Sequence, residues 1–142
     1  MEVVDDGGSN VTSTYAMASD SAGVPYYIYH REKSPLGNHM RLAKFQGGQW
    51  HVSTISDLFP RDAELTIDEN DVCHLVFTDY GGSPYWLNYG HNADGSWHFG
   101  ELDVGLDYRV FSAPMLLPDG TVQVLYTKGS GLWRAVVAPE LP

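Results

Sequence analysis

The sequence predicts an all-β protein, and three observations support that prediction. A segment of about 48 residues is present twice and begins a third time, and its copies align without gaps as Ala16–Tyr29, Glu64–Phe77 and Ala113–Tyr126. Aromatic residues make up 13% of the chain, and 15 Gly and 8 Pro interrupt its 142 residues regularly. No stretch of a dozen residues has the 3.6-residue apolar period of a helix. Many short strands joined by turns explain all three features.

The first half of each repeat predicts a strand, a tight turn and a second strand. The turns carry Gly, Asn and Asp, which tolerate positive φ. The second strand is apolar on both faces, with Ile28, Val76 and Leu125 on the same face in the three copies. A strand of this kind is covered on both sides, as in stacked sheets. We expect first strands at 16–19, 64–67 and 113–116, and second strands at 24–29, 72–77 and 121–126.

The second half of each repeat predicts a polar loop and two more strands. The fourth strand opens with Trp50 in the first copy and Trp97 in the second, after a turn that contains Gly. Aromatic residues that recur at matching positions predict packing between repeats rather than contact with a ligand. We expect loops at 32–38, 79–84 and 128–131, and third strands at 40–45, 85–89 and 132–137.

A four-stranded antiparallel unit of this kind is the blade of a β-propeller. The sequence therefore predicts one unit over 1–142 with three blades, at 14–56, 62–104 and 111–138. The third copy has no Gly turn, no Trp and no fourth strand of its own. Residues 2–6 parallel Glu101–Gly105 of the second copy, so we predict that they form a displaced fourth strand that completes a third blade.

Three blades do not close a ring, since propellers have four or more. We expect two chains to associate head to tail about a two-fold axis and form a six-bladed ring, in which residues 2–6 complete the third blade of the partner. An open stack would leave two apolar blade faces in water. The alternative is that the sequence is part of a longer propeller.

The segment Leu42–Val52 (Leu-Ala-Lys-Phe-Gln-Gly-Gly-Gln-Trp-His-Val) resembles the BNR-type repeats of sialidase-like propellers. Ala93-Asp-Gly-Ser-Trp97 is similar to their Asp-box, which occupies the hairpin between strands three and four. The usual Asp-box has a further residue between Asp and Gly, and the first copy here has no Asp. The resemblance covers most of the chain as a blade pattern. Because such families include sialidases, polysaccharide lyases and sugar-binding lectins, it implies a glycan ligand.

Composition excludes some partners. The net charge is −10, from 18 acidic and 8 basic residues, so we expect no nucleic acid, which requires a basic face. Met1–Asp6 lacks the features of a signal peptide, and no apolar stretch is long enough to span a bilayer. We expect a soluble chain without a membrane partner, in a compartment that the sequence does not specify. The single cysteine, Cys73, has apolar neighbours and is expected to be a buried, inert thiol.

Candidate binding residues lie in the loops expected on one face of the propeller. Carboxylates, cations and tyrosines that converge there can bind a sugar or an anion. The six histidines show no metal-ligand spacing, and we expect no cofactor. His51 and His98 follow the repeated Trp and are expected to be structural. The candidate ligand-binding residues are His30, Arg31, Arg61, Asp79, Tyr80, Tyr108, Arg109 and Lys128.

The first functional hypothesis is a non-catalytic, carbohydrate-directed binding module, because no motif ties the candidate residues to a reaction. A sialidase-like hydrolase is the alternative, with Arg31, Arg61 and Arg109 on the substrate carboxylate, Tyr80 or Tyr108 as nucleophile and Glu32 as base. A polysaccharide lyase using His30, Arg31 and Tyr80 has no better support. A protein-interaction scaffold is the third hypothesis.

Overall fold

The computed structural model describes residues 4–5, 11–33, 37–106 and 112–137 of the chain. Within these residues every regular element is a strand, and all strand pairs are antiparallel. No helix that could cross a membrane is present among them. The strands form two sheets of four and one sheet of three.

Each sheet is a simple up-and-down meander in which consecutive strands pair. Sheet 1 contains β1 (Val11–Ser19), β2 (Pro25–Lys33), β3 (Gly37–Gln46) and β4 (Gln49–Ser56). Sheet 2 contains β5 (Pro60–Ile67), β6 (Cys73–Asp79), β7 (Tyr85–His91) and β8 (His98–Leu106). Sheet 3 contains β9 (Ser112–Leu116), β10 (Val122–Lys128) and β11 (Gly131–Val137).

Side-chain and backbone hydrogen bonds close the turns between first and second strands. Asp20 Oδ1 accepts from the amides of Ala22 and Val24, and Asp68 Oδ1 accepts in the same way from Asn70 and Val72. The last residue of each turn is left-handed, with φ of 77° at Gly23, 61° at Asp71 and 80° at Gly120. The prediction of turns with positive φ is confirmed, because Gly and Asp are the residues that adopt this conformation at low cost.

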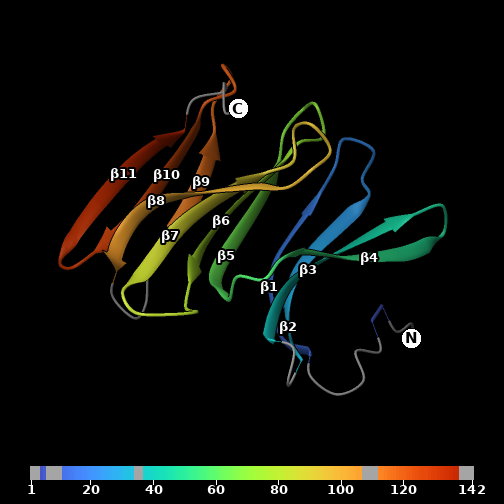
Figure 1. The fold of residues 1–142 in the computed structure, drawn as a ribbon. Helices are drawn as coiled ribbons and strands as arrows, with labels where there is room; N and C mark the ends of the chain where they lie inside the picture. Colours follow the sequence, from blue (N-terminus) through green and yellow to red (C-terminus); the bar gives the residue numbers. More distant parts are fainter. Residues whose placement is uncertain (1–3, 6–10, 34–36, 107–111, 138–142) are drawn as a thin grey trace.

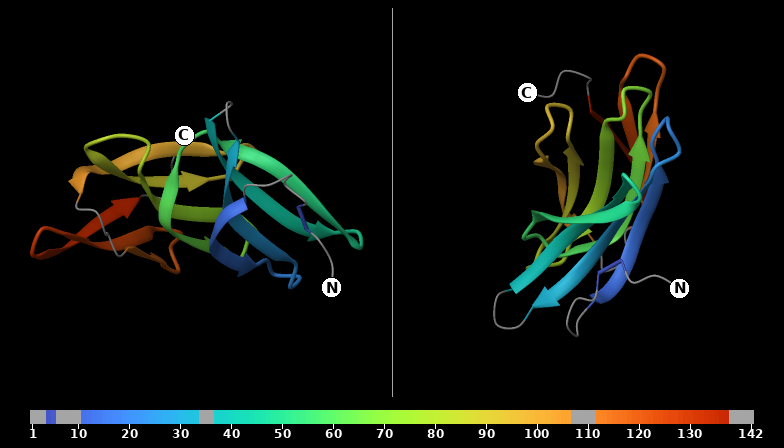
Figure 2. Two further views of the ribbon diagram at one scale, coloured as in Figure 1. Left: turned by 90° about the horizontal axis from the view of Figure 1, so that it is seen from below. Right: turned by 90° about the vertical axis from the view of Figure 1, so that its right-hand side faces the viewer.

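The three sheets lie side by side with sheet 2 in the middle (Figure 1), and the views in Figure 2 agree. Neighbouring sheets meet mainly along their first strands, where β5 contacts both β1 and β9. One apolar cluster fills the junction between sheets 1 and 2, and it includes Ile28, Leu75 and Phe77. A second fills the junction between sheets 2 and 3, with Val76, Leu87 and Val124. Sheet 2 is thus covered on both faces, and the second strand β6 is buried from Cys73 to Thr78.

Most strand predictions are confirmed, including the three-stranded third sheet of the described residues. Cys73 is fully buried, and burial raises the pKa of its thiol to about 11. Trp97 packs into the junction between sheets 1 and 2, as expected from its recurrence. The three sheets are antiparallel meanders stacked face to face.

Two predictions require correction or remain open. The loop expected at 32–38 is shorter, because Glu32 and Lys33 continue β2 and pair with Asn38 and Gly37 of β3. The polar residues at 32–38 indicated a loop, but backbone pairing between β2 and β3 continues as far as Lys33 and Gly37. Of the strand predicted at 2–6, only Val4 and Asp5 lie within the described residues, and in the single chain they are not in a strand.

Candidate functional site

Most of the predicted site residues lie at one end of the sheets, which we call the loop end. It is the end at which β2, β6 and β10 finish and at which the chain passes from one sheet to the next. His30 and Arg31 lie near the end of β2, Arg61 lies at the start of β5, and Asp79 and Lys128 end β6 and β10. Tyr80 follows Asp79. Tyr108 and Arg109 lie outside the described residues.

The structure brings Arg61 and Tyr80 together in a stack of flat groups at the loop end. The Arg61 guanidinium carbon lies 5.2 Å from the ring centroid of Tyr80 and 5.8 Å from that of Phe59. Tyr80 and Tyr85 stack with their ring centroids 4.3 Å apart and an interplanar angle of 22°. The four side chains are half-buried. We call Phe59, Arg61, Tyr80 and Tyr85 the Arg61 cluster.

Neighbouring groups hold this cluster in place. Asp79 Oδ1 accepts hydrogen bonds from the amides of Phe59, at 3.0 Å, and Gly81, at 2.9 Å. The Tyr80 amide donates to the Phe59 carbonyl at 2.9 Å. His30, which is buried, lies against the Phe59 ring at 4.5 Å between centroids. Asp79 therefore joins the segment before β5 to the loop after β6. His30 of sheet 1 packs against the Phe59 ring.

The other two predicted cations each face a carboxylate. Lys128 Nζ donates to Asp103 Oδ1 at 2.7 Å, and the Tyr126 hydroxyl donates to Asp103 Oδ2 at 2.8 Å. Arg31 lies 3.9 Å from Asp5, and the Tyr29 hydroxyl donates to Asp5 Oδ2 at 2.5 Å. Burial and then the hydrogen bond to Asp103 raise the pKa of Tyr126 to about 12, so the hydroxyl keeps its proton. Arg31, Arg61 and Lys128 thus belong to three separate groups of contacts.

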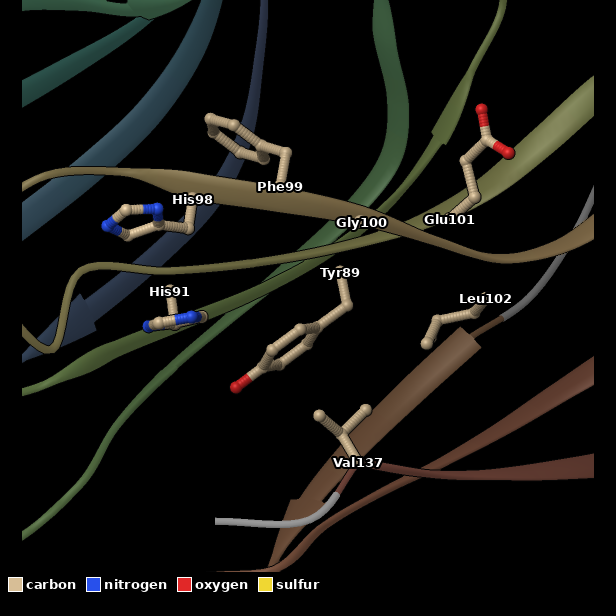
Figure 3. A pocket seen from close by; sticks show the side chains of 8 residues that line it. All are labelled: Tyr89, His91, His98, Phe99, Gly100, Glu101, Leu102 and Val137. Atoms are coloured by element: carbon tan, nitrogen blue, oxygen red, sulfur yellow. The ribbon is translucent and has the colours of Figure 1, made fainter. Parts of the chain in front are cut away.

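A hollow of about 260 Å³ lies away from the loop end, between sheets 2 and 3. Its lining comes from β7, β8 and the last residue of β11, and comprises Tyr89, His91, His98, Phe99, Gly100, Glu101, Leu102 and Val137. Figure 3 shows Tyr89, Leu102 and Val137 pointing toward one another, whereas Phe99 and Glu101 point to the other side of β8. The hollow is therefore apolar at its centre, with histidines at one side.

A short polar chain lies beside the hollow. The Tyr89 hydroxyl is 2.6 Å from His74 Nδ1, and His74 Nε2 is 3.5 Å from Asp68. Burial raises the pKa of Tyr89 to about 12, so Tyr89 donates to the imidazole. Burial lowers the pKa of His74, although the nearby Asp68 opposes the shift. The neutral imidazole then carries its proton on Nε2, toward Asp68.

The two histidines expected to be structural contact their own hairpins. His98 Nε2 lies 2.9 Å from Asp94 Oδ2, and Asp94 Oδ1 also accepts from the Ser96 amide. His51 Nε2 lies 3.2 Å from the Gln46 carbonyl. The segment similar to an Asp-box is thus the hairpin between β7 and β8, where its Asp closes the turn. Among the described residues no group of three His, Cys, Asp or Glu side chains is placed to hold a metal ion.

Several site residues were not predicted. Phe59 and Tyr85 come from two segments whose proximity depends on how β6 pairs with both β5 and β7, and neither stands out in its own segment. Asp103 could have been found from its partner. Tyr126 and Tyr29 occupy the same repeat position, where the second copy has Phe77, and a recurring hydroxyl indicates a polar partner. The hollow has no local signal, because it forms between sheets.

No protein-family model matches the chain, and no curated protein matches it. The sialidase-like resemblance therefore stays a prediction.

Proposed function

We propose that the protein is a non-catalytic binding module directed at carbohydrate, and that the Arg61 cluster is its contact surface. The observation that carries this proposal is the stack of Arg61 with Phe59, Tyr80 and Tyr85 at the loop end. The stack is half-buried, so its flat faces and polar tips border solvent.

The chemistry of the cluster suits a sugar. A pyranose ring has apolar C–H faces that pack on tyrosine rings, and its hydroxyls accept hydrogen bonds from a guanidinium. Stacking on Tyr80 holds the Arg61 guanidinium in position, which reduces the entropy lost when it binds a ligand oxygen. The positive charge also favours sugars that carry a carboxylate or sulfate.

We place this surface on a propeller ring. The three sheets form half of a six-bladed ring, and a head-to-tail pair of chains completes it about a two-fold axis. The loop ends of all six blades then face the same side, so the two Arg61 clusters lie on one surface. This arrangement is supported by the blade order of the strands and by the apolar flanks of sheets 1 and 3.

The alternative functions predict different outcomes in the same assays. A sialidase-like hydrolase needs several arginines on one carboxylate, but Arg31 and Arg61 contact different groups in the described structure. A lyase would release unsaturated products that absorb in the ultraviolet. A scaffold would bind protein and no sugar.

The test is a panel of neutral, carboxylated and sulfated oligosaccharides, with binding followed by calorimetry or by NMR shifts. We expect millimolar or tighter binding, lost in Tyr80→Ala and Arg61→Ala and retained in His51→Ala, an exposed residue at the opposite end of sheet 1. A flat response across the panel contradicts the proposal. Turnover of a fluorogenic sialoside, or release of an unsaturated product, would replace it with one of the enzymatic alternatives.

A further inference from the structure

The contact between Asp103 and β10 recurs at the outer face of sheet 1. Tyr126 and Lys128 on β10 hold Asp103, which belongs to β8, the fourth strand of the preceding sheet. Tyr29 and Arg31 occupy the equivalent positions on β2, and both contact Asp5. Asp5 therefore occupies, relative to sheet 1, the place that a fourth strand of a preceding sheet would occupy. This match shifts the sequence alignment by one residue, since it pairs Asp5 with Asp103 rather than with Val104.

At the junction between sheets 1 and 2, all three residue types of this contact are replaced. Ser56 of β4 pairs with Met40 as Asp103 of β8 pairs with Leu87, so Ser56 stands in the place of the carboxylate. Phe77 replaces the tyrosine and Asp79 replaces the cation. The carboxylate, the hydroxyl and the cation are thus all absent from these positions at this junction. All three are present between sheets 2 and 3 and at the outer face of sheet 1. Such joint replacement indicates that they act as one contact between blades.

The hollow between sheets 2 and 3 marks where a strand is missing. In the junction between sheets 1 and 2, Trp97 and Phe99 of the fourth strand β8 pack against the same apolar cluster as Leu42 and Ile55 of sheet 1. Tyr89 and Leu102 hold the corresponding positions on sheet 2, and they line the hollow. Within the described residues no strand pairs with the outer edge of β11. A fourth strand on β11 would cover this hollow as β8 covers its counterpart.

The two outer faces of the half-ring both carry exposed apolar side chains. On sheet 3 the outward face carries Met115, Leu125, Leu132 and Val136, each more than two-fifths exposed. On sheet 1 the outward face carries Met17 and an aromatic group in which Trp50 lies 5.5 Å from Tyr27 and 5.2 Å from Phe45. Both faces resemble the internal junctions, which are covered by a neighbouring sheet.

We propose that the hollow and the edge of β11 receive Val4 and Asp5 of a second copy of this chain, whose Asp5 stays bound to Tyr29 and Arg31 of its own sheet 1. This inference rests on the ring described under "Proposed function" and names its interface. By the repeat register, Asp5 of the second copy lies opposite Leu132, because Leu87 of sheet 2 pairs with Asp103 and corresponds to Leu132 of sheet 3. The two flanks then cover each other, and the two-fold symmetry closes the assembly.

Cysteine cross-linking of the full chain tests this register. Val4 adjoins Asp5, which contacts sheet 1, whereas Leu132 lies on β11 of sheet 3. Sheet 2 lies between these two sheets (Figure 1), so a disulfide between Val4→Cys and Leu132→Cys within one chain is excluded. Val4 corresponds to Leu102, the extra residue in the register shift of β8 between Glu101 and Asp103, and Leu102 lies on the same face as Leu87. We therefore expect Val4→Cys with Leu132→Cys to give a covalent dimer on oxidation, because both side chains lie on one face of adjacent strands. Val4→Cys with Glu69→Cys, an exposed turn residue, is the control and should stay monomeric on a non-reducing gel. The native Cys73 is buried and does not compete.

A matched pair of variants tests the role of Asp5 by sedimentation. Tyr29→Phe removes the hydroxyl bonded to Asp5 and is expected to weaken dimerisation by about tenfold or more, as for a hydrogen bond to a charged group. Tyr126→Phe removes the equivalent hydrogen bond between sheets 2 and 3, away from the proposed interface, and should leave dimerisation unchanged. Equal effects of the two variants on association would contradict the proposal.

The outcomes separate this inference from the sugar-binding proposal. A dimer that cross-links through Leu132 supports the interface whether or not it binds sugar. A dimer that cross-links no better than the control overturns the interface and leaves the Arg61 cluster untouched. A stable monomer at high micromolar concentration, or an assembly larger than two chains, overturns the two-chain closure.

Discussion

The two junctions inside the molecule are built from equivalent strands but are closed to different extents. Between sheets 1 and 2 the contact is mainly apolar, with Phe77 at the centre and Trp97 and Phe99 over its outer part. Polar contacts lie in its exposed turns, where the Ser21 amide and hydroxyl donate to Asp71. Between sheets 2 and 3 the inner part is apolar, but the Asp103 contact and the His74–Tyr89 pair are polar, and a hollow remains outside β11. The junction between sheets 1 and 2 is sealed by residues of β8, the fourth strand of sheet 2. Sheet 3 lacks a fourth strand within the described residues.

The largest difference is expected between truncating a side chain at the centre of the closed junction and truncating one at the border of the hollow. Phe77 is fully buried between sheets 1 and 2, so Phe77→Ala should lower the free energy of unfolding by about 3–5 kcal/mol. Leu102 borders the hollow and is half-buried, so Leu102→Ala should cost about 1 kcal/mol or less. Urea denaturation of the two variants measures both values. Equal losses would contradict the difference in packing.

A second comparison uses two glycines on the paired strands β7 and β8. A Cβ on Gly90 would lie 2.5 Å from two ring carbons of Phe99, on the closed side of sheet 2. Gly90→Ala must displace this ring and should cost about 1–3 kcal/mol. A Cβ on Gly100 meets nothing within 4 Å, so Gly100→Ala on the side of the hollow should change stability by no more than about 0.5 kcal/mol. Thermal unfolding of both variants checks the prediction.

Local patterns explain which parts of this structure could be predicted from sequence. The strands follow from apolar runs punctuated by Gly and Asp, so Val24, Val72 and Thr121 lie within one residue of the observed starts of β2, β6 and β10. The Arg61 cluster could be predicted only in part, because Arg61 and Tyr80 are polar loop residues while Phe59 and Tyr85 look like ordinary core residues. The hollow depends on how sheets 2 and 3 pack, which no single segment encodes.

Acid should weaken the junction between sheets 2 and 3 more than the apolar one. Burial lowers the pKa of His74 and of His91 below the ordinary value of 6.5. The unfolded chain therefore binds protons more readily than the folded chain, and the free energy of unfolding rises with pH in this range. Stability contributed by the neutral histidines is present above pH 6.5 and is lost as the pH falls through their lowered pKa values.

Urea denaturation at pH 7.5 and 5.5 measures this loss. We expect a lower midpoint at pH 5.5, and a smaller difference between the two pH values in His74→Gln, which removes one of the titrating groups. An unchanged pH dependence in this variant would show that the loss arises elsewhere.

The smallest effect is expected from Lys128, whose ion pair with Asp103 closes the polar contact between β8 and β10. Both side chains are partly exposed, so solvent screening limits the contribution of the pair, and Lys128→Met should cost about 1 kcal/mol or less. Burial alone would raise the pKa of Asp103, but hydrogen bonds from Lys128, Tyr126 and the Val104 amide hold it below its usual value. This contribution is present above the ordinary pKa of 3.8 and is lost as the pH falls through the lowered value. The difference between wild type and Lys128→Met should therefore be largest near neutral pH, and it should vanish in strong acid, where Asp103 is protonated in both. A difference that persisted in strong acid would assign the effect to packing of the lysine side chain and not to its charge.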